Sequence, residues 1–157
     1  MVRVLFVCTG NICRSPTAEG VFRHLVREAG LEDAITTDSA GTSDYHTGEP
    51  PDRRSEQAAR ARGVDIADLR ARQVTVADFR RFDYVLAMDA GHLNQLRRMA
   101  PPDGKAEVRL FMDYAPDAPK REVPDPYYGE GSHFHEVLDL VEAGARGLLE
   151  HIRRAGV

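Results

Sequence analysis

Eight consecutive residues, Cys8 to Ser15, bring a thiol and a guanidinium together in the order Cys-Thr-Gly-Asn-Ile-Cys-Arg-Ser. They follow a short apolar run, Val2 to Val7, and lead into a helical pattern that opens with Pro16. Backbone N–H groups at a helix N-terminus have no partner within the helix, and the helix dipole places positive potential there. Such an end binds phosphate-like anions. The octet therefore predicts a loop that binds a phosphate and holds a nucleophile beneath it.

Cys8 and Arg14 would divide that chemistry between them. The guanidinium of Arg14 is a planar fork that matches two phosphate oxygens at once. The same positive field stabilises a thiolate at Cys8, and the thiolate rather than the thiol is the nucleophile. A lone cysteine is more often a small buried hydrophobic residue. Here the whole octet agrees, so we interpret Cys8 as reactive.

The other residues of the octet suit a tight curl in which successive N–H groups converge on one centre. Gly10 can adopt the positive φ that such a curl often needs, and Asn11 tolerates the left-handed region better than most residues. Ser15 is a good N-cap, with Pro16 in the first helical position. The alternative for Ser15 is that its hydroxyl donates to the sulfur of Cys8.

The composition is that of an ordinary globular chain of 157 residues, with 29% charged and 42% hydrophobic residues. This length predicts one domain, residues 1–157, with a sizeable core. The net charge of −4 argues against a general nucleic-acid binder. No apolar run approaches the roughly 18 residues of a membrane-spanning helix. No basic-then-apolar leader precedes the first strand, so we expect a cytoplasmic protein.

Cysteine and histidine usage argues against structural metal sites and disulfides. Two cysteines within one loop cannot form the disulfide framework of a secreted domain, and they are too few for a zinc site. The histidines have no metal-ligand spacing, and we expect all of them at the surface or at a rim. They are His24, His46, His92, His133, His135 and His151.

Strand-like and helix-like segments alternate along the chain. The strand patterns cover residues 2–7, 35–39, 84–88 and 107–112. The helical patterns cover residues 16–29, 52–62, 89–99 and 132–154, with a short helix opened by a capping box at 75–78. The alternation predicts an α/β fold, a doubly wound four-stranded parallel sheet with helices on both faces. Such sheets bind ligands at the carboxyl ends of their strands, which is where Cys8 lies.

A second candidate group lies in the loop before the last helix, where the chain reads Asp125-Pro126-Tyr127-Tyr128. Attack by a thiolate on a phosphoryl group expels an oxyanion that needs a proton. A carboxylic acid on a loop can supply that proton and later activate water. Pro126 biases Asp125 toward an extended conformation, and the paired tyrosines can wall a slot for a flat ring. Asp-Pro is also a common turn dipeptide, so this interpretation depends on the Cys8 loop.

Together the two motifs resemble those of the low-molecular-weight protein tyrosine phosphatases, in the same order and over essentially the whole chain. Cys8 to Ser15 is similar to the phosphate loop of that family, and Asp125 to Tyr128 is similar to its acid loop. Shorter segments also match, namely Ser39-Ala-Gly-Thr, Ala71-Arg72-Gln73 and Met88-Asp89. The resemblance implies hydrolysis of phosphotyrosine in proteins or peptides.

The resemblance also implies a role for each residue of the site. Cys8 would be the nucleophile that forms a phosphocysteine, Arg14 would bind the phosphoryl oxygens and stabilise the transition state, and Asp125 would be the acid and base. Cys13 would form a reversible disulfide with Cys8 under oxidation. The family uses no metal or organic cofactor. The residues of the phosphate loop would be Thr9, Gly10, Asn11, Ile12, Cys13 and Ser15.

Three further positions bear on the shape of the site. The resemblance implies that Ser39, together with Asn11 and Ser15, shapes the loop and the thiolate. Family members often place a histidine that bonds the loop asparagine two residues before Ala71, and this chain has Leu69 there. Tyr45 lies where the family often places an aromatic wall residue, and the alternative is a loop aromatic packed on the surface.

Three other functions are compatible with a loop of this kind. A thioredoxin-coupled arsenate reductase shares the fold and a similar loop, but it needs further downstream cysteines for thiol exchange, and no cysteine follows Cys13. A catalytically silent phosphate-binding module would be favoured by loss of Cys8 or Asp125, and both are present. A phosphoarginine phosphatase tends to carry threonine where this chain has Ile12, whose apolar side chain suits a phenyl ring. The physiological substrate and the oligomeric state stay open, with a monomer favoured.

Overall fold

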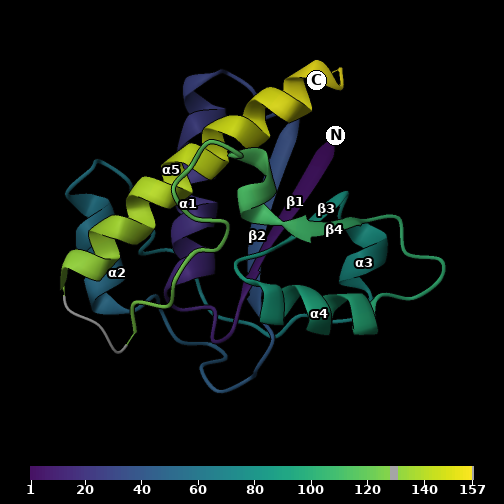
Figure 1. Cartoon of the computed structure of the whole chain (residues 1–157), viewed down its shortest axis with the longest axis horizontal. Coiled ribbons are helices and arrows are strands. Elements are labelled where there is room, and N and C mark those ends of the chain that lie inside the picture. The colour runs from purple at the N-terminus through teal and green to yellow at the C-terminus, as the bar shows by residue number, and fades with distance from the viewer. Residues whose placement is uncertain (128–130, 157) are drawn as a thin grey trace.

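The computed structural model describes residues 1–127 and 131–156, and its centre is a four-stranded parallel sheet (Figure 1). The strands lie side by side in the order β2-β1-β3-β4, and all three neighbouring pairs are parallel. They are β1 Val2–Cys8, β2 Ile35–Gly41, β3 Tyr84–Ala87 and β4 Glu107–Leu110. The predicted doubly wound α/β fold is therefore confirmed.

Helices cover both faces of the sheet, as Figure 1 shows, with α1 and α5 on one side and α3 and α4 on the other. Alternation along β1 explains this, because successive side chains of a strand point to opposite faces. Val4 and Phe6 pack with α1 and α5, whereas Leu5 and Val7 pack with α3 and α4. The helices are α1 Arg14–Glu28, α2 Arg53–Arg60, α3 Asp78–Arg81, α4 Ala90–Met99 and α5 Gly131–Arg154, and a 3₁₀ helix, η1, spans Phe111–Tyr114.

Several predicted boundaries differ from those in the structure, and two of the differences have a clear cause. The last strand ends at Leu110 rather than 112, because Phe111 and Met112 turn into η1 and bury their side chains completely. Strand β2 continues past Ser39 to Gly41, because it pairs with β1 along its whole length, up to Cys8 opposite Gly41. Among the described residues no helix is long and apolar enough to span a membrane.

The strand order brings two loops together at the carboxyl edge of the sheet. From β1 the chain moves to β2 on one side and then returns to β3 on the other side. In such sheets the point at which the order reverses is the usual ligand site. The loop after β1 starts at Cys8, and the loop after β3 starts with Met88 and Asp89.

Candidate active site

The loop between β1 and α1 is anchored by its carbonyl oxygens. The N–H groups of Thr42 and Ser43 donate to the carbonyls of Cys8 and Thr9, at 2.9 and 3.0 Å, and that of Asp52 donates to the carbonyl of Ile12 at 2.7 Å. No described residue accepts a hydrogen bond from the backbone N–H groups of residues 9–13. The loop therefore keeps these donors for an anion, as predicted for a phosphate-binding loop.

The curl of the loop is made by Asn11 and not by Gly10. Asn11 adopts φ 59°, and Gly10 is not among the residues with positive φ. Gly10 serves a different need, since a Cβ at this position would lie 2.9 Å from Cδ2 of His46. Glycine therefore lets the His46 ring lie directly against the loop backbone.

Ser15 is not the helix cap. Helix α1 begins at Arg14, with Cys13 at the N-cap position and no side-chain cap. The hydroxyl of Ser15 lies 3.0 Å from the sulfur of Cys8, which is the alternative that the sequence had left open. A thiolate carries no proton, so Ser15 would be the donor once Cys8 ionises.

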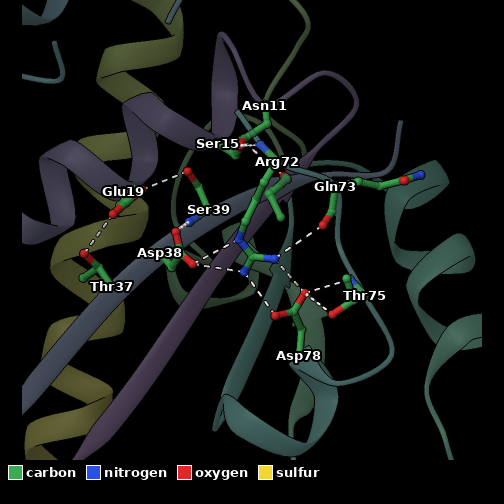
Figure 2. Close-up of polar contacts among 11 residues, drawn as sticks. Asn11, Ser15, Glu19, Thr37, Asp38, Ser39, Arg72, Gln73, Thr75 and Asp78 are labelled. Atoms are coloured by element: carbon green, nitrogen blue, oxygen red, sulfur yellow. Dashed lines mark hydrogen bonds and ion pairs between the residues drawn. The ribbon is translucent and has the colours of Figure 1, made fainter. Parts of the chain in front are cut away.

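Asn11 connects this pair to a segment distant in the sequence (Figure 2). Its Nδ2 donates to Oγ of Ser15 at 2.8 Å, and its Oδ1 accepts from the backbone N–H of Arg72 at 3.0 Å. The Arg72 guanidinium is itself held by Asp38 at 3.0 Å and by Asp78 at 3.0 Å. Leu69, in place of the histidine common in the family, packs against the core instead.

The guanidinium of Arg14 is held from one side. Its Nη1 donates to Oδ2 of Asp89 at 2.9 Å and to the carbonyl of Val123 at 3.1 Å. Within the described part of the chain, nothing accepts a hydrogen bond from its Nε. Both protons of Nη1 are used and one proton of Nη2 reaches Oγ1 of Thr9 at 3.4 Å, so the Nε proton and the second Nη2 proton remain available for two phosphate oxygens. The side chain is 5% exposed, which excludes most competing water.

Asp89, predicted at the start of the 89–99 helical pattern, both caps α4 and binds Arg14. Its Oδ1 does accept from the N–H of His92, at 2.9 Å, while its Oδ2 binds Arg14. Partial burial by itself would raise the pKa of Asp89, but the His92 N–H and the Arg14 charge lower it below its ordinary value. Asp89 is thus an anion that holds Arg14 in place.

Asp125 lies on the opposite side of Arg14 and is nearly half exposed. Its Oδ2 is 3.7 Å from Nη2 of Arg14, and its Oδ1 accepts from the N–H of Tyr127 at 3.0 Å. The loop is fastened by Val123, whose N–H donates to the carbonyl of Met88 at 2.8 Å. The phosphate loop and the loop of Asp125, which are far apart in sequence, therefore lie close together, as the two motifs predicted.

Arg54 holds the same loop from α2. It donates through Nη2 to the carbonyl of Tyr127 at 2.8 Å, and its guanidinium lies over the Tyr127 ring with 5.6 Å to the centroid. The sequence interpretation did not single out Arg54. Its position in the first turn of an exposed helix has no local signature of such a contact.

A cavity of about 250 Å³ opens above the thiol. Its walls include Ile12, Tyr45 and Tyr127, three of the four residues predicted for the substrate slot. Tyr45 is 87% exposed, so it stands at the mouth rather than in the core. Tyr128, the fourth, lies outside the described residues. His46 also lines the cavity, and no other histidine among the described residues does so.

Ser39 does not reach the loop. Its hydroxyl donates to Oε1 of Glu19 on α1 at 2.8 Å, and the hydroxyl of Thr37 donates to the other oxygen of Glu19 at 3.2 Å (Figure 2). Burial raises the pKa of Glu19 above its ordinary value despite these two donors. Any effect of Ser39 on the thiolate therefore passes through α1, and its predicted role stays a prediction.

The two cysteines differ in their suitability as the nucleophile. Both are free and buried. Burial raises the pKa of Cys13 from 9.0 to about 12, so Cys13 stays a protonated thiol. Only a thiolate is a good nucleophile. Both thiols line the cavity, and the Ser15 hydroxyl 3.0 Å from the Cys8 sulfur points to Cys8 as the nucleophile.

One predicted exposure is wrong, that of His92. It lies in the first turn of α4 with 4% exposure, and its Nε2 is 2.7 Å from Oγ1 of Thr9. The sequence could not place it, because a histidine in the first turn of a helix can face either solvent or the neighbouring loop. In the described ranges no three His, Cys, Asp or Glu side chains gather in a way that could hold a metal ion.

Comparison with known proteins agrees with this geometry. The profile of the family described as low molecular weight phosphotyrosine protein phosphatase matches residues 3–157. The chain belongs to this family. A Streptomyces coelicolor low molecular weight protein-tyrosine-phosphatase is 49% identical over 154 residues, which cover 96% of this chain and 93% of that protein. The predicted enzyme class is confirmed, because the relatives of this chain are named as protein-tyrosine phosphatases, a family of hydrolases.

Two solved structures share the fold of this family member over nearly its full length. A protein tyrosine phosphatase from Entamoeba histolytica, crystallised with Hepes in the active site, superposes with a TM-score of 0.94 at 35% identity and full coverage of both chains. DARP, a Drosophila arginine phosphatase, superposes with a TM-score of 0.90 at 31% identity, covering 97% of this chain and 98% of that one.

Proposed function

We propose that this phosphatase hydrolyses phosphotyrosine in proteins or peptides through a phosphocysteine at Cys8. The observation that carries the proposal is the position of Arg14. Asp89 and Val123 hold one side of its guanidinium, and Arg14 lines the same cavity as Cys8 and the loop residues whose N–H groups have no acceptor among the described residues. Such a site binds the equatorial oxygens of a phosphoryl group and stabilises the charge that develops on them.

In the first step the Cys8 thiolate attacks phosphorus. The sulfur–phosphorus bond forms as the bond to the ester oxygen breaks, and Asp125 gives its proton to the departing phenoxide. In the second step Asp125 takes a proton from water, the water oxygen attacks phosphorus, and the sulfur–phosphorus bond breaks. Inorganic phosphate leaves, and the hydroxyl of Ser15, 3.0 Å away, donates to the regenerated thiolate.

The test uses Cys8→Ser with Cys13→Ser as its matched control, since both thiols lie in the same loop. Cys8→Ser should abolish turnover of a phosphotyrosine peptide yet still bind inorganic phosphate, because Arg14 and the loop N–H groups remain. Rapid quenching of the wild type should trap a phosphate on Cys8. Near-normal turnover by Cys8→Ser, or phosphate trapped on Cys13, would contradict the mechanism.

A second candidate substrate is phosphoarginine, which the likeness to the Drosophila arginine phosphatase supports. Against it, the wall of the cavity carries the apolar side chain of Ile12. A phenyl ring buries well against such a wall and against tyrosine, with about 0.5–1.5 kcal/mol beyond area burial from aromatic pairing.

The two substrates are separated by kcat/KM on matched peptides. We expect phosphotyrosine to exceed phosphoarginine and phosphoserine by at least roughly 100-fold, about 2.7 kcal/mol of transition-state binding. Ile12→Thr should narrow that preference, and Tyr45→Ala at the mouth should change it less. Equal kcat/KM for the two peptides would overturn the tyrosine assignment and leave the Cys8 mechanism standing.

We further propose that the chain works as one domain in the reducing cytoplasm. Support comes from its two unpaired cysteines, because a nucleophilic Cys8 must stay reduced to act. Labelling of intact cells and fractionation would locate the protein, and recovery in an oxidising compartment would contradict this placement.

A further inference from the structure

Four side chains, those of Asp89, Arg14, Thr9 and His92, lie in a ring behind the phosphate loop, and three of the four contacts in it are hydrogen bonds. Arg14 binds Asp89 through Nη1 at 2.9 Å and approaches Oγ1 of Thr9 through Nη2 at 3.4 Å. His92 lies on the far side, with Nε2 2.7 Å from the same Thr9 oxygen, while its buried Nδ1 is 3.2 Å from Oδ1 of Asp89 but outside hydrogen-bond geometry. The ring joins the loop after β1 to the first turn of α4.

The directions of these hydrogen bonds follow from the chemistry of each group. Arg14 can only donate, so the Thr9 oxygen accepts from it and the Thr9 proton must go elsewhere. The nearest acceptor is Nε2 of His92, if that nitrogen carries no proton. The remaining proton of a neutral imidazole then sits on Nδ1, which faces the carboxylate of Asp89.

The surroundings of His92 keep it neutral. Burial, with the Arg14 charge beside it, lowers its pKa from 6.5 to about 4. Three carboxylates act in the opposite direction, those of Asp89 at the start of α4 and of Glu122 and Asp125 on the acid loop. They do not outweigh burial and Arg14.

We propose that His92 is a positioning residue for Arg14, and that it acts through the hydroxyl of Thr9. Its neutral Nε2 takes the Thr9 proton, which turns the Thr9 lone pair toward Nη2 of Arg14. The free edge of the guanidinium is then fixed before phosphate arrives, so binding costs less ordering. This inference rests on the proposed part of Arg14 in phosphate binding. A histidine that only packs α4 against the loop would not depend on the Thr9 hydroxyl.

The experiment compares variants on both sides of the contact. His92→Gln can place an amide oxygen where Nε2 lies, whereas His92→Leu cannot accept a hydrogen bond. Thr9→Val removes the hydroxyl from the other side, and Thr9→Ser keeps it. The readouts are kcat/KM for a phosphotyrosine peptide, the inhibition constant of inorganic phosphate, and Tm. Leu96→Ala removes a fully buried side chain from the same helix, α4, and serves as the control for a loss of stability without a loss of the contact.

His92→Leu and Thr9→Val should each lower kcat/KM and phosphate affinity by roughly 10-fold, the scale of one lost hydrogen bond to a charged or orienting group. The double variant should lose no more than either single one, because both remove the same contact. His92→Gln and Thr9→Ser should recover most of the loss. Leu96→Ala should lower Tm and leave the phosphate inhibition constant unchanged.

Additive losses in the double variant would overturn the proposal, and so would equal losses in His92→Gln and His92→Leu at matched Tm. If His92→Leu does not fold, the Thr9→Val and Thr9→Ser pair and His92→Gln still decide, since Thr9 is exposed and Gln replaces His92 with another polar side chain. Failure of the proposed Cys8 mechanism would be seen separately, as near-normal turnover by Cys8→Ser. The inhibition constant of inorganic phosphate reports on anion binding by Arg14 whether or not that mechanism holds.

Discussion

The Oδ1 atom of Asn11 accepts a hydrogen bond from the backbone N–H of Arg72, with 3.0 Å between the two atoms. The other end of the same amide donates to Ser15, whose hydroxyl touches the Cys8 sulfur. A segment 61 residues away thus supports the nucleophile through one side chain. The support uses a backbone N–H, so it needs no polar side chain at position 69, which is Leu69 in this chain.

Replacing Asn11 should separate the cost of its backbone conformation from the loss of its amide. Asn11→Ala places a Cβ without a local hydrogen bond at φ 59°, which costs about 1–2 kcal/mol, whereas Asn11→Gly adopts this φ freely. Both variants should lose kcat, because Ser15 is no longer oriented. Chemical denaturation should show Ala less stable than Gly. If the two variants are equally stable, strain at this position does not matter.

Asp125→Ala should lower kcat for a phosphotyrosine peptide by roughly 10²–10⁴-fold, because the departing phenoxide loses its proton donor. The loss should be much smaller for an aryl phosphate whose leaving group is stable as an anion. Steady-state kinetics with both substrates gives the measurement. Asp117→Ala removes an exposed carboxylate from the same long loop and should leave both rates unchanged. Equal losses on the two substrates would exclude Asp125 as the acid.

Oxidation should inactivate the enzyme reversibly through its two cysteines. Peroxide converts the Cys8 thiolate to a sulfenic acid, and the Cys13 thiol then displaces water to form a disulfide. Because burial raises the pKa of Cys13 to about 12, this capture should accelerate as the pH is raised. Mass spectrometry should find the Cys8–Cys13 bond, and reductant should restore activity. Full recovery of Cys13→Ser after the same exposure would show that Cys13 gives no protection.

His92 should make stability depend on pH below neutrality. Its pKa falls from 6.5 to about 4 on folding, so the unfolded chain binds the extra proton between these values. Its contribution to the free energy of unfolding is complete above pH 6.5 and is lost as the pH falls toward 4. Urea unfolding of wild type and His92→Gln across this window isolates the effect. A stability difference that does not change with pH would mean that His92 titrates alike in both states.

Much of the site could be predicted because it is local in sequence. Cys8 and Arg14 lie in one octet between a strand and a helix, so their spacing predicted a thiol and a guanidinium in one loop, whereas for Ser15 it left open both a helix cap and a bond to the Cys8 sulfur. The parallel sheet followed from the alternation of strand and helix patterns. Asp125 was found because its loop motif resembles that of a known family, and the structure brings it to 3.7 Å from Arg14.

The tertiary structure decided which distant groups hold these residues in place. Asp89 and His92 reach the loop because the carboxyl ends of β1 and β3 lie side by side at the edge of the sheet. Arg72 reaches Asn11 because its strand-like segment pairs with the end of β2, where Gln73 bridges to Gly41. Local spacing cannot predict such contacts, since the burial of a side chain depends on which elements pack over it. The sequence by itself therefore determined the chemistry of the loop, and the packing of the sheet determined how that chemistry is oriented.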